Sequence, residues 1–239
     1  MQSINASQEA ERISAFLKNI LKKTGKKNII IGWSGGIDST VCLFLLQQAI
    51  SSKNIFIIHM PYDVSYIKEM AGLTDIPKEN IKVISIKKIV DAVAGTVQTS
   101  DNIRQGNIMA RIRMILLFDF AKKIDGLVCG TENKSEHLLG YFTRFGDEAS
   151  DVEPIRHLYK TEVYQLARFL KIPSLFISKK PSADLWHNQT DEGEFGFSYE
   201  QADSVLRGKI KGIDIKIVKK VQERIKRNSF KHKVPFILA

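Results

Sequence analysis

The sequence predicts an α/β fold: a doubly wound, Rossmann-like parallel β-sheet flanked by helices. Short runs rich in Ile and Val alternate with longer segments whose apolar residues have helical spacing, which is the order of elements in such folds. The runs are apolar at successive positions rather than at every second one, as expected of parallel strands covered on both faces. The length of 239 residues suits one domain, and we expect a single domain over residues 1–239.

The first three elements are expected near the N-terminus. A helix over residues 4–23 carries apolar side chains at helical spacing, and Thr24 and Gly25 interrupt the pattern. Residues 28–33, NIIIGW, form an uninterrupted apolar run and are expected to be the first buried strand. Residues 38–50 return to helical character, so a helix is expected directly after this strand.

The same alternation continues through the middle of the chain. Residues 54–61 and 81–86 are expected to be strands, with a short helix over residues 64–72 between them. A long helix is expected over residues 106–123, where Ile, Leu and Phe side chains repeat along one side, and residues 125–131 form the fourth strand.

The sequence changes character after residue 131. Residues 140–160 and 178–197 hold many Gly, Asp, Glu and aromatic residues and few periodic apolar ones, so both are expected to be long ordered loops. Long loops in a compact domain are more often functional than idle. Helices are expected to resume at residues 160–170, 198–207 and 213–227.

Composition places few limits on partners. The net charge is +10, with much of the excess near the C-terminus, which fits either a solvated helix face or an anionic partner. No apolar run approaches the roughly 20 residues of a membrane helix, and the N-terminus lacks a secretory pattern, so we expect a cytoplasmic protein without a membrane partner. The two cysteines, Cys42 and Cys129, lie in separate apolar segments and are expected to be buried, reduced thiols.

The most informative segment lies between the first strand and the helix that follows it. Its glycines let backbone N–H groups approach phosphate oxygens, and the helix N-terminus adds partial positive charge. A carboxylate in this loop opposes anion binding unless a cation lies between, and Mg²⁺ held jointly by Asp38 and by phosphates removes that conflict. The alternative is an ordinary glycine-rich turn with Asp or Ser capping the helix. The residues of this turn expected to bind phosphates are Gly32, Trp33, Ser34, Gly35, Gly36, Ile37, Asp38 and Ser39.

Residues 34–39, SGGIDS, resemble the SGGxDS loop of the ATP pyrophosphatases, which split ATP between its α and β phosphates. This resemblance implies an adenine nucleotide alpha hydrolase-like fold. Within that superfamily, three further segments resemble the NAD synthetase family: residues 106–114 (GNIMARIRM), residues 130–151 (beginning GTENKSE) and residues 180–196 (beginning KPSADL). The resemblance extends over roughly residues 10–235.

The resemblance to NAD synthetases implies roles for several side chains at the ATP site. Asp38 and Glu136 match Mg²⁺ ligands, and both follow strands of one parallel sheet, whose carboxyl edge is where such sheets bind ligands. Thr131 and Ser182 match residues that contact ATP, and Lys160 matches a lysine that contacts its phosphates and is expected to be catalytic. Considered singly, Glu136 could be an exposed helix residue, Thr131 a helix N-cap and Lys160 a solvated side chain.

The resemblance also implies a site for a second substrate, nicotinic acid adenine dinucleotide. Arg111, Arg144 and Asp151 match residues that bind it, and the pair His232 and Lys233 resembles a His-Lys pair that contacts it. Asp151 is expected either to orient or deprotonate ammonium in catalysis or to bind substrate only. Arg111 could instead form a surface salt bridge, and the His-Lys pair could belong to a solvated basic tail.

The match departs from the family in a few places. Residues 59–63 lack an arginine that some relatives carry, and Val234 stands where many have arginine. Ile103 replaces an aromatic residue found in several relatives, so Phe145 or Tyr141 is expected to supply stacking on the nicotinate side.

The implied activity is ammonia-dependent NAD synthesis. ATP would adenylate the nicotinate carboxylate of the dinucleotide with release of pyrophosphate, and ammonia would then displace AMP. No segment is left for the glutaminase domain of glutamine-dependent relatives, so free ammonia, or ammonia from a separate protein, is expected as the nitrogen donor. The family resemblance also implies a homodimer, and no nucleic-acid partner is expected.

Two alternative functions remain open. One is an ATP pyrophosphatase acting on tRNA or on another carboxylate or carbonyl substrate; the positive charge favours it slightly, although no persulfide cysteine pair or added RNA-binding domain is evident. The other is a nucleotide-binding protein without chemistry. The joint presence of Asp38, Glu136, Lys160 and Ser182 argues against that second alternative.

Overall fold

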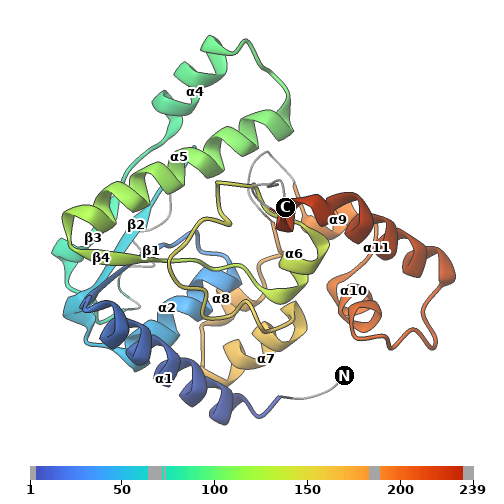
Figure 1. The fold of residues 1–239 in the computed structure, drawn as a ribbon, viewed down its shortest axis with the longest axis horizontal. Coiled ribbons are helices and arrows are strands. Elements are labelled where there is room, and N and C mark those ends of the chain that lie inside the picture. The colour runs from blue at the N-terminus through green and yellow to red at the C-terminus, as the bar shows by residue number, and fades with distance from the viewer. Residues whose placement is uncertain (1–3, 64–71, 73, 183–188, 234–239) are drawn as a thin grey trace, which may run out of the picture.

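A four-stranded parallel sheet forms the centre of the computed structural model, which describes residues 4–63, 72, 74–182 and 189–233 (Figure 1). The strands are β1 (Asn28–Gly32), β2 (Ile55–His59), β3 (Ile81–Val83) and β4 (Gly126–Cys129), in the spatial order β3-β2-β1-β4. All three pairings are parallel, and β1, in the middle, pairs with β2 on one side and with β4 on the other. The predicted fold class is therefore confirmed.

Helices cover both faces of the sheet. On one face, α1 (Ala6–Thr24), α2 (Ile37–Ala49), α7 (Lys160–Phe169) and the short α8 (Ser174–Ile177) enclose the largest apolar core (Figure 1). On the other face, α5 (Asn102–Lys123) lies across the strands and α4 (Lys87–Thr96) packs beside it, around a second apolar core. Because both faces of the sheet are covered, successive residues of a strand must be apolar, which explains the continuous Ile and Val runs in the sequence.

A third apolar cluster lies beyond α7 (Figure 1). It joins α6 (Lys134–Leu139), α9 (Asp191–Phe195), α10 (Tyr199–Leu206) and α11 (Ile215–Asn228). Because α6 follows β4 directly, this cluster adjoins the carboxyl edge of the sheet, where ligands bind in open parallel sheets. Short 3₁₀ helices at Ser52–Asn54, Lys78–Asn80 and Ser229–His232 complete the described elements.

Several expected boundaries differ from the structure. Helix α4 was not expected, although Ile86, Val90 and Ala94 are buried at helical spacing; the apolar Ile89 and Val93 on its exposed side obscure that pattern in the sequence. The third strand ends at Val83, three residues before the expected end. The helix expected over residues 64–72 lies almost entirely outside the described residues.

One helix boundary also needs correction, and the short helices α6, α8 and α9 were not expected. Helix α5 starts at Asn102 rather than at residue 106, because the Asp101 side chain accepts a hydrogen bond from Arg104 N and caps it. The expected loop over residues 178–197 contains α9.

Two expectations about environment can be compared directly with the structure. Cys42 and Cys129 are both buried and free, as expected. None of the helices in the described part of the chain is long and apolar enough to cross a membrane.

Candidate active site

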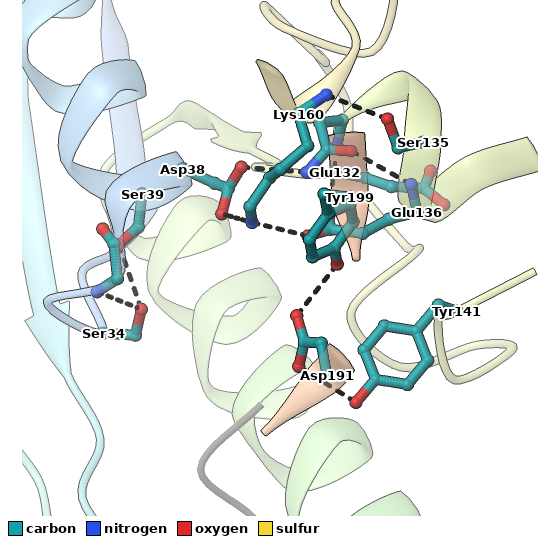
Figure 2. A network of polar contacts seen from close by, with 12 residues as sticks. Ser34, Asp38, Ser39, Glu132, Ser135, Glu136, Tyr141, Lys160, Asp191 and Tyr199 are labelled. Carbon is teal, nitrogen blue, oxygen red and sulfur yellow. Dashed lines mark hydrogen bonds and ion pairs between the residues drawn. The ribbon is translucent and has the colours of Figure 1, made fainter. Parts of the chain in front are cut away.

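The loop between β1 and α2 has the shape of an anion-binding turn. Gly35 has a φ of 79°, a conformation that favours glycine, and the N-cap residue Gly36 makes no side-chain capping bond. The Oγ atom of Ser34 accepts from Gly36 N at 3.1 Å and lies 3.0 Å from Oγ of Ser39 (Figure 2). The alternative of Asp or Ser capping this helix is wrong, so Asp38, in its first turn, is available for other contacts.

The side chains of two residues predicted to bind ATP pack in the core and do not line the loop surface. Trp33 is buried, and its Nε1 donates to Oγ1 of Thr40 at 3.0 Å. Ile37 is also buried in the core on the α2 side of the sheet. Their backbone groups remain part of the turn, but the structure brings only the serine and aspartate side chains of the loop toward the carboxyl edge.

Three predicted residues meet at one point: Asp38, Glu136 and Lys160 (Figure 2). The Nζ atom of Lys160 lies 2.5 Å from Oδ2 of Asp38 and 3.0 Å from Oε1 of Glu136. The Lys160 side chain is 2% exposed, and those of Asp38 and Glu136 are 17% and 16% exposed. The alternatives of a solvated Lys160 and of an exposed Glu136 are therefore wrong.

Asn133 completes this cluster, and sequence reasoning missed it. Its Nδ2 donates to Oδ1 of Asp38 at 2.9 Å, and its Oδ1 accepts from Glu136 N at 3.0 Å. Asn133 is the N-cap of α6, and Glu136 returns a bond to Asn133 N at 3.3 Å, so the two form a capping box. The N-x-x-E spacing could have shown this cap. Thr131, suggested as an N-cap, is instead half-buried before the helix.

The electrostatics of the cluster favour a further cation. Burial raises the pKa of Glu136 to about 8, and the neighbouring ammonium of Lys160 opposes that shift. Burial lowers the pKa of Lys160, but the carboxylates of Asp38 and Glu136 outweigh it and hold the pKa above its ordinary value. A divalent cation among these oxygens would keep both carboxylates ionised.

The chemistry of the donor set fits Mg²⁺. Among the described residues, no group of three or more His, Cys, Asp or Glu side chains is arranged to hold a metal by itself. A pair of carboxylates next to a phosphate-binding turn is the arrangement expected for Mg²⁺, which is usually bound by one or two carboxylates together with substrate phosphates. Asp38 and Glu136 would be its protein ligands.

Most residues predicted to bind the dinucleotide gather around the C-terminal 3₁₀ helix. Arg111 Nε donates to the carbonyl oxygen of Arg144 at 3.3 Å, so Arg111 contacts that backbone rather than forming a surface salt bridge. The Arg144 guanidinium lies between two rings, 5.3 Å from the Phe145 centroid and 5.5 Å from that of Phe230. Phe230 was not predicted as a site residue.

The basic C-terminal pair has an unexpected neighbour. The rings of His232 and His137 lie 4.4 Å apart, and both His232 and Lys233 are exposed. The lysine that reaches inward is Lys231, whose Nζ donates to the carbonyl oxygens of Gly140 and Phe142, each at 2.7 Å. The C-terminal 3₁₀ helix is therefore attached to the loop that carries Arg144.

The remaining two predicted residues lie at the rim. Asp151 is exposed; its Oδ2 accepts from Val128 N at 2.8 Å, and its backbone N donates to Val128 O, so it extends the edge of β4. Ser182 is half-buried, and the carbonyl oxygen of the preceding Pro181 accepts from Asp191 N at 3.0 Å. The structure thus does not bring Asp151 into the hydrogen-bonded cluster around Lys160.

Comparison with known sequences identifies the family: the NAD synthase profile matches residues 9–235. The chain belongs to the NAD synthase family. The family resemblance found in the sequence motifs is thereby confirmed, and the match covers the phosphate-binding turn, the Lys160 cluster and the segment around Arg144 in one continuous alignment.

Curated and solved members of the family are similar over nearly the whole chain. The NH(3)-dependent NAD(+) synthetase of Fusobacterium nucleatum is 38% identical over 248 residues, which cover 98% of this chain and 96% of that protein. The structure of an NMN synthetase from Francisella tularensis has a TM-score of 0.89 at 29% identity and covers 99% of both chains. An NH3-dependent NAD synthetase from Campylobacter jejuni has a TM-score of 0.83 at 31% identity, covering 99% of this chain and 100% of that one.

Proposed function

We propose that this chain is an ammonia-dependent NAD synthetase, a ligase that forms a C–N bond. In the proposed reaction, the nicotinate carboxylate of nicotinic acid adenine dinucleotide attacks the α-phosphate of ATP and pyrophosphate leaves. Ammonia then attacks the adenylate and AMP leaves. The observation that carries the proposal is the Asp38–Lys160–Glu136 cluster beside an SGGxDS turn, in a chain of the NAD synthase family.

Activation by ATP answers a chemical difficulty. A carboxylate is a poor acyl donor because its leaving group would be oxide, whereas the adenylate carries AMP as a good leaving group. In the first step, negative charge develops on the departing pyrophosphate. The N–H groups of the turn at Gly35 and Gly36 and the ammonium of Lys160 are donors that would stabilise that charge. Mg²⁺, when bound, adds Lewis-acid stabilisation of the same phosphates.

Lys160 must change partners for this role. Its ammonium donates to both carboxylates, so it lies between the two proposed Mg²⁺ ligands. We propose that the ammonium moves toward the phosphates when ATP and Mg²⁺ enter. The Nδ2 atom of Asn133 continues to donate to Oδ1 of Asp38, and its backbone N continues to donate to Oε2 of Glu136, so both carboxylates stay in place during the exchange.

The dinucleotide would lie on the side of Arg144. Arg111, Arg144, Asp151 and the C-terminal pair are proposed to bind it. For Asp151 we favour binding over proton transfer, because its carboxylate accepts the Val128 N–H and lies at the rim. Two arginines and the basic C-terminal segment provide positive charge for the phosphates of this substrate.

A second candidate substrate follows from the solved structures. The Francisella NMN synthetase has a higher TM-score, 0.89, than the Campylobacter NAD synthetase, 0.83. The same adenylation and ammonia transfer would apply to a nicotinate mononucleotide, which carries the same carboxylate. We propose the dinucleotide as the principal substrate because the sequence match to NH(3)-dependent NAD(+) synthetases includes several proteins at 37–45% identity.

We further propose a homodimer and a cytoplasmic location. Helices α4 and α5, with the C-cap residue of α4, carry exposed large apolar side chains: Ile89, Val93, Val97, Ile115 and Phe118. The two helices pack beside each other, and we propose their exposed apolar side chains as the contact between subunits. Two buried free thiols are compatible with a reducing compartment.

The test is an amidation assay. The purified protein is incubated with ATP, Mg²⁺ and ammonium chloride, and with either the dinucleotide or the mononucleotide; product formation is followed, with a glutamine-only reaction as the control. NAD formed from ammonium but not from glutamine supports the proposal. A higher kcat/KM with the mononucleotide would replace the proposed principal substrate. Failure to amidate either nucleotide, with pyrophosphate released on tRNA, would overturn the function.

One variant separates binding from chemistry. Glu136→Gln keeps a hydrogen-bond acceptor at the N3 position of the α6 capping box but removes the charge. We expect turnover to fall by at least about a hundredfold, since removing one transition-state charge contact typically costs that much. A nucleotide-binding protein without chemistry would show no turnover in either form and would change only in ATP affinity.

A further inference from the structure

Tyr199 lies directly beside the ammonium of Lys160. The centroid of its ring is 5.0 Å from Lys160 Nζ, and the Tyr199 side chain is buried. A cation near an aromatic ring is attracted by the negative face of the ring, most strongly where water is excluded. The ammonium is therefore held by an aromatic ring as well as by the carboxylates of Asp38 and Glu136.

Asp191 fixes the orientation of that ring. The hydroxyl of Tyr199 donates to Oδ2 of Asp191 at 2.9 Å, and the hydroxyl of Tyr141 donates to Oδ1 at 3.1 Å (Figure 2). Asp191 is buried in the first turn of α9. Burial raises the pKa of Tyr199 well above its ordinary value, so the phenol remains a hydrogen-bond donor at neutral pH.

The same aspartate is connected to the segment that carries Ser182. The backbone N of Asp191 donates to the carbonyl oxygen of Pro181 at 3.0 Å, and Thr190 caps α9 through its side chain. The buried carboxylate accepts hydrogen bonds from two phenols, and both bonds must break before it can turn away. Asp191 thus joins the Ser182 segment, through Tyr199, to Lys160.

We propose that Tyr199 and Asp191 are positioning residues for Lys160: Tyr199 holds the ammonium over its ring, and Asp191 holds Tyr199. The inference rests on the proposed function, since it assigns Lys160 to the phosphates of ATP. A lysine side chain has four rotatable bonds, and electrostatic stabilisation requires the charge to be in place before the reaction begins. Tyr199 limits where the ammonium can go when it leaves Asp38 and Glu136.

A double-mutant cycle on ATP affinity tests this coupling. The dissociation constant of Mg·ATP is measured calorimetrically, up to millimolar nucleotide, for wild type, Tyr199→Leu, Lys160→Met and the double variant. Loss of a desolvated cation–ring contact corresponds to roughly tenfold, so Tyr199→Leu should weaken binding about tenfold in the wild-type background. In the Lys160→Met background the same change should alter binding less than about twofold. Tyr199→Phe keeps the ring but loses the hydrogen bond to Asp191, so its affinity should lie between those of wild type and Tyr199→Leu.

Phe195 provides the matched control. Its ring lies 5.6 Å from that of Tyr199 in the same apolar cluster. Phe195→Leu should lower the melting temperature and change ATP affinity by the same small factor in both backgrounds. If Tyr199→Leu weakens binding equally in both backgrounds, or does not weaken it in wild type, the positioning role is overturned. The cycle needs no second substrate, so wild-type protein that fails to bind Mg·ATP would instead count against the proposed function.

Discussion

Lys160 Nζ lies 2.5 Å from Oδ2 of Asp38, which joins the start of α7 to the first turn of α2 across the carboxyl edge of the sheet. Together with the bond to Glu136, this contact neutralises part of the charge of two half-buried carboxylates. It also places a monovalent cation where a divalent one is proposed to bind with ATP. Competition between the two cations can be measured without any turnover.

Lys160→Met should increase the affinity of the nucleotide-free protein for Mn²⁺. Removing a positive charge about 4 Å from a cation site is worth several kcal/mol at an effective dielectric constant of 20, so we expect at least about a tenfold gain. Free Mn²⁺ is measured by electron paramagnetic resonance. Lys160→Arg keeps the charge and should show no gain.

Lys134→Met is the control for this measurement. Lys134 is on the same helix as Glu136, but its Nζ lies over the Tyr159 ring, 4.5 Å from the centroid. Its removal should leave Mn²⁺ affinity within about twofold of wild type, because its half-buried ammonium lies over the Tyr159 ring and not between the two carboxylates. Equal Mn²⁺ affinity in Lys160→Met and wild type would contradict the exchange of Lys160 for the metal.

Phe230→Ala should raise the KM for the dinucleotide without changing the KM for ATP. The Phe230 ring contacts the Arg144 guanidinium, and loss of a cation–ring contact is worth about 0.5–1.4 kcal/mol, or roughly two- to tenfold. Steady-state kinetics with each substrate varied in turn give both constants. Phe230→Tyr should behave as wild type, and Phe16→Ala, a change at a similarly exposed Phe on α1, should alter neither KM. A parallel rise in both KM values would show that Phe230 does not act through Arg144.

Glu153→Gln should make stability less dependent on pH. Burial raises the pKa of Glu153 to about 8, with Ser150 Oγ donating to it at 2.7 Å and Glu132 nearby. Because the folded pKa lies above the unfolded value, the folded protein binds more protons, and its stability falls as pH rises from about 4.5 to about 8. Between pH 5 and pH 8, wild type should lose on the order of a few kcal/mol relative to Glu153→Gln.

Urea unfolding at several pH values checks this prediction. Glu11→Gln, at an exposed position of α1, should follow the wild-type curve. Identical curves for wild type and Glu153→Gln would mean that Glu153 titrates at its ordinary pKa in the folded protein.

Ile115→Glu should convert the proposed dimer to a monomer. Ile115 is 66% exposed on α5, and a charge placed in an apolar interface is costly to bury. Light scattering coupled to gel filtration gives the molar mass of each form. Leu175→Glu introduces the same charge at an exposed Leu on α8 and should remain a dimer. A monomeric wild type would remove the basis for this prediction.

The strands were predictable because β1, β2 and β4 are buried on both faces and therefore read as unbroken apolar runs. Helix α4 was missed although its buried residues Val90 and Ala94 lie four apart, because the exposed Ile89 and Val93 add apolar residues to its other side. Helix α9 was missed because its five residues hold only one large apolar side chain, Phe195.

The site shows the same division between local and tertiary information. Asp38 and Glu136 could be predicted because each lies in a motif next to a strand. Their meeting with Lys160 depends on α7 packing against α2, which no local pattern encodes. Phe230 and Tyr199 could not be singled out from sequence, since an aromatic residue beside a cation is visible only once the chain has folded. The capping-box pattern in the sequence could have identified Asn133.

The capping box of α6 gives one further consequence, for the evolution of the enzyme. Glutamine serves as well as glutamate at the third position of such a box, so a chain with Gln at position 136 would start its helix at the same residue. A single base change in a glutamate codon produces glutamine. A gene of this family is therefore one mutation from encoding a folded protein that we expect to be unable to hold the metal. Selection for correct folding alone would not remove that variant; only selection for activity would.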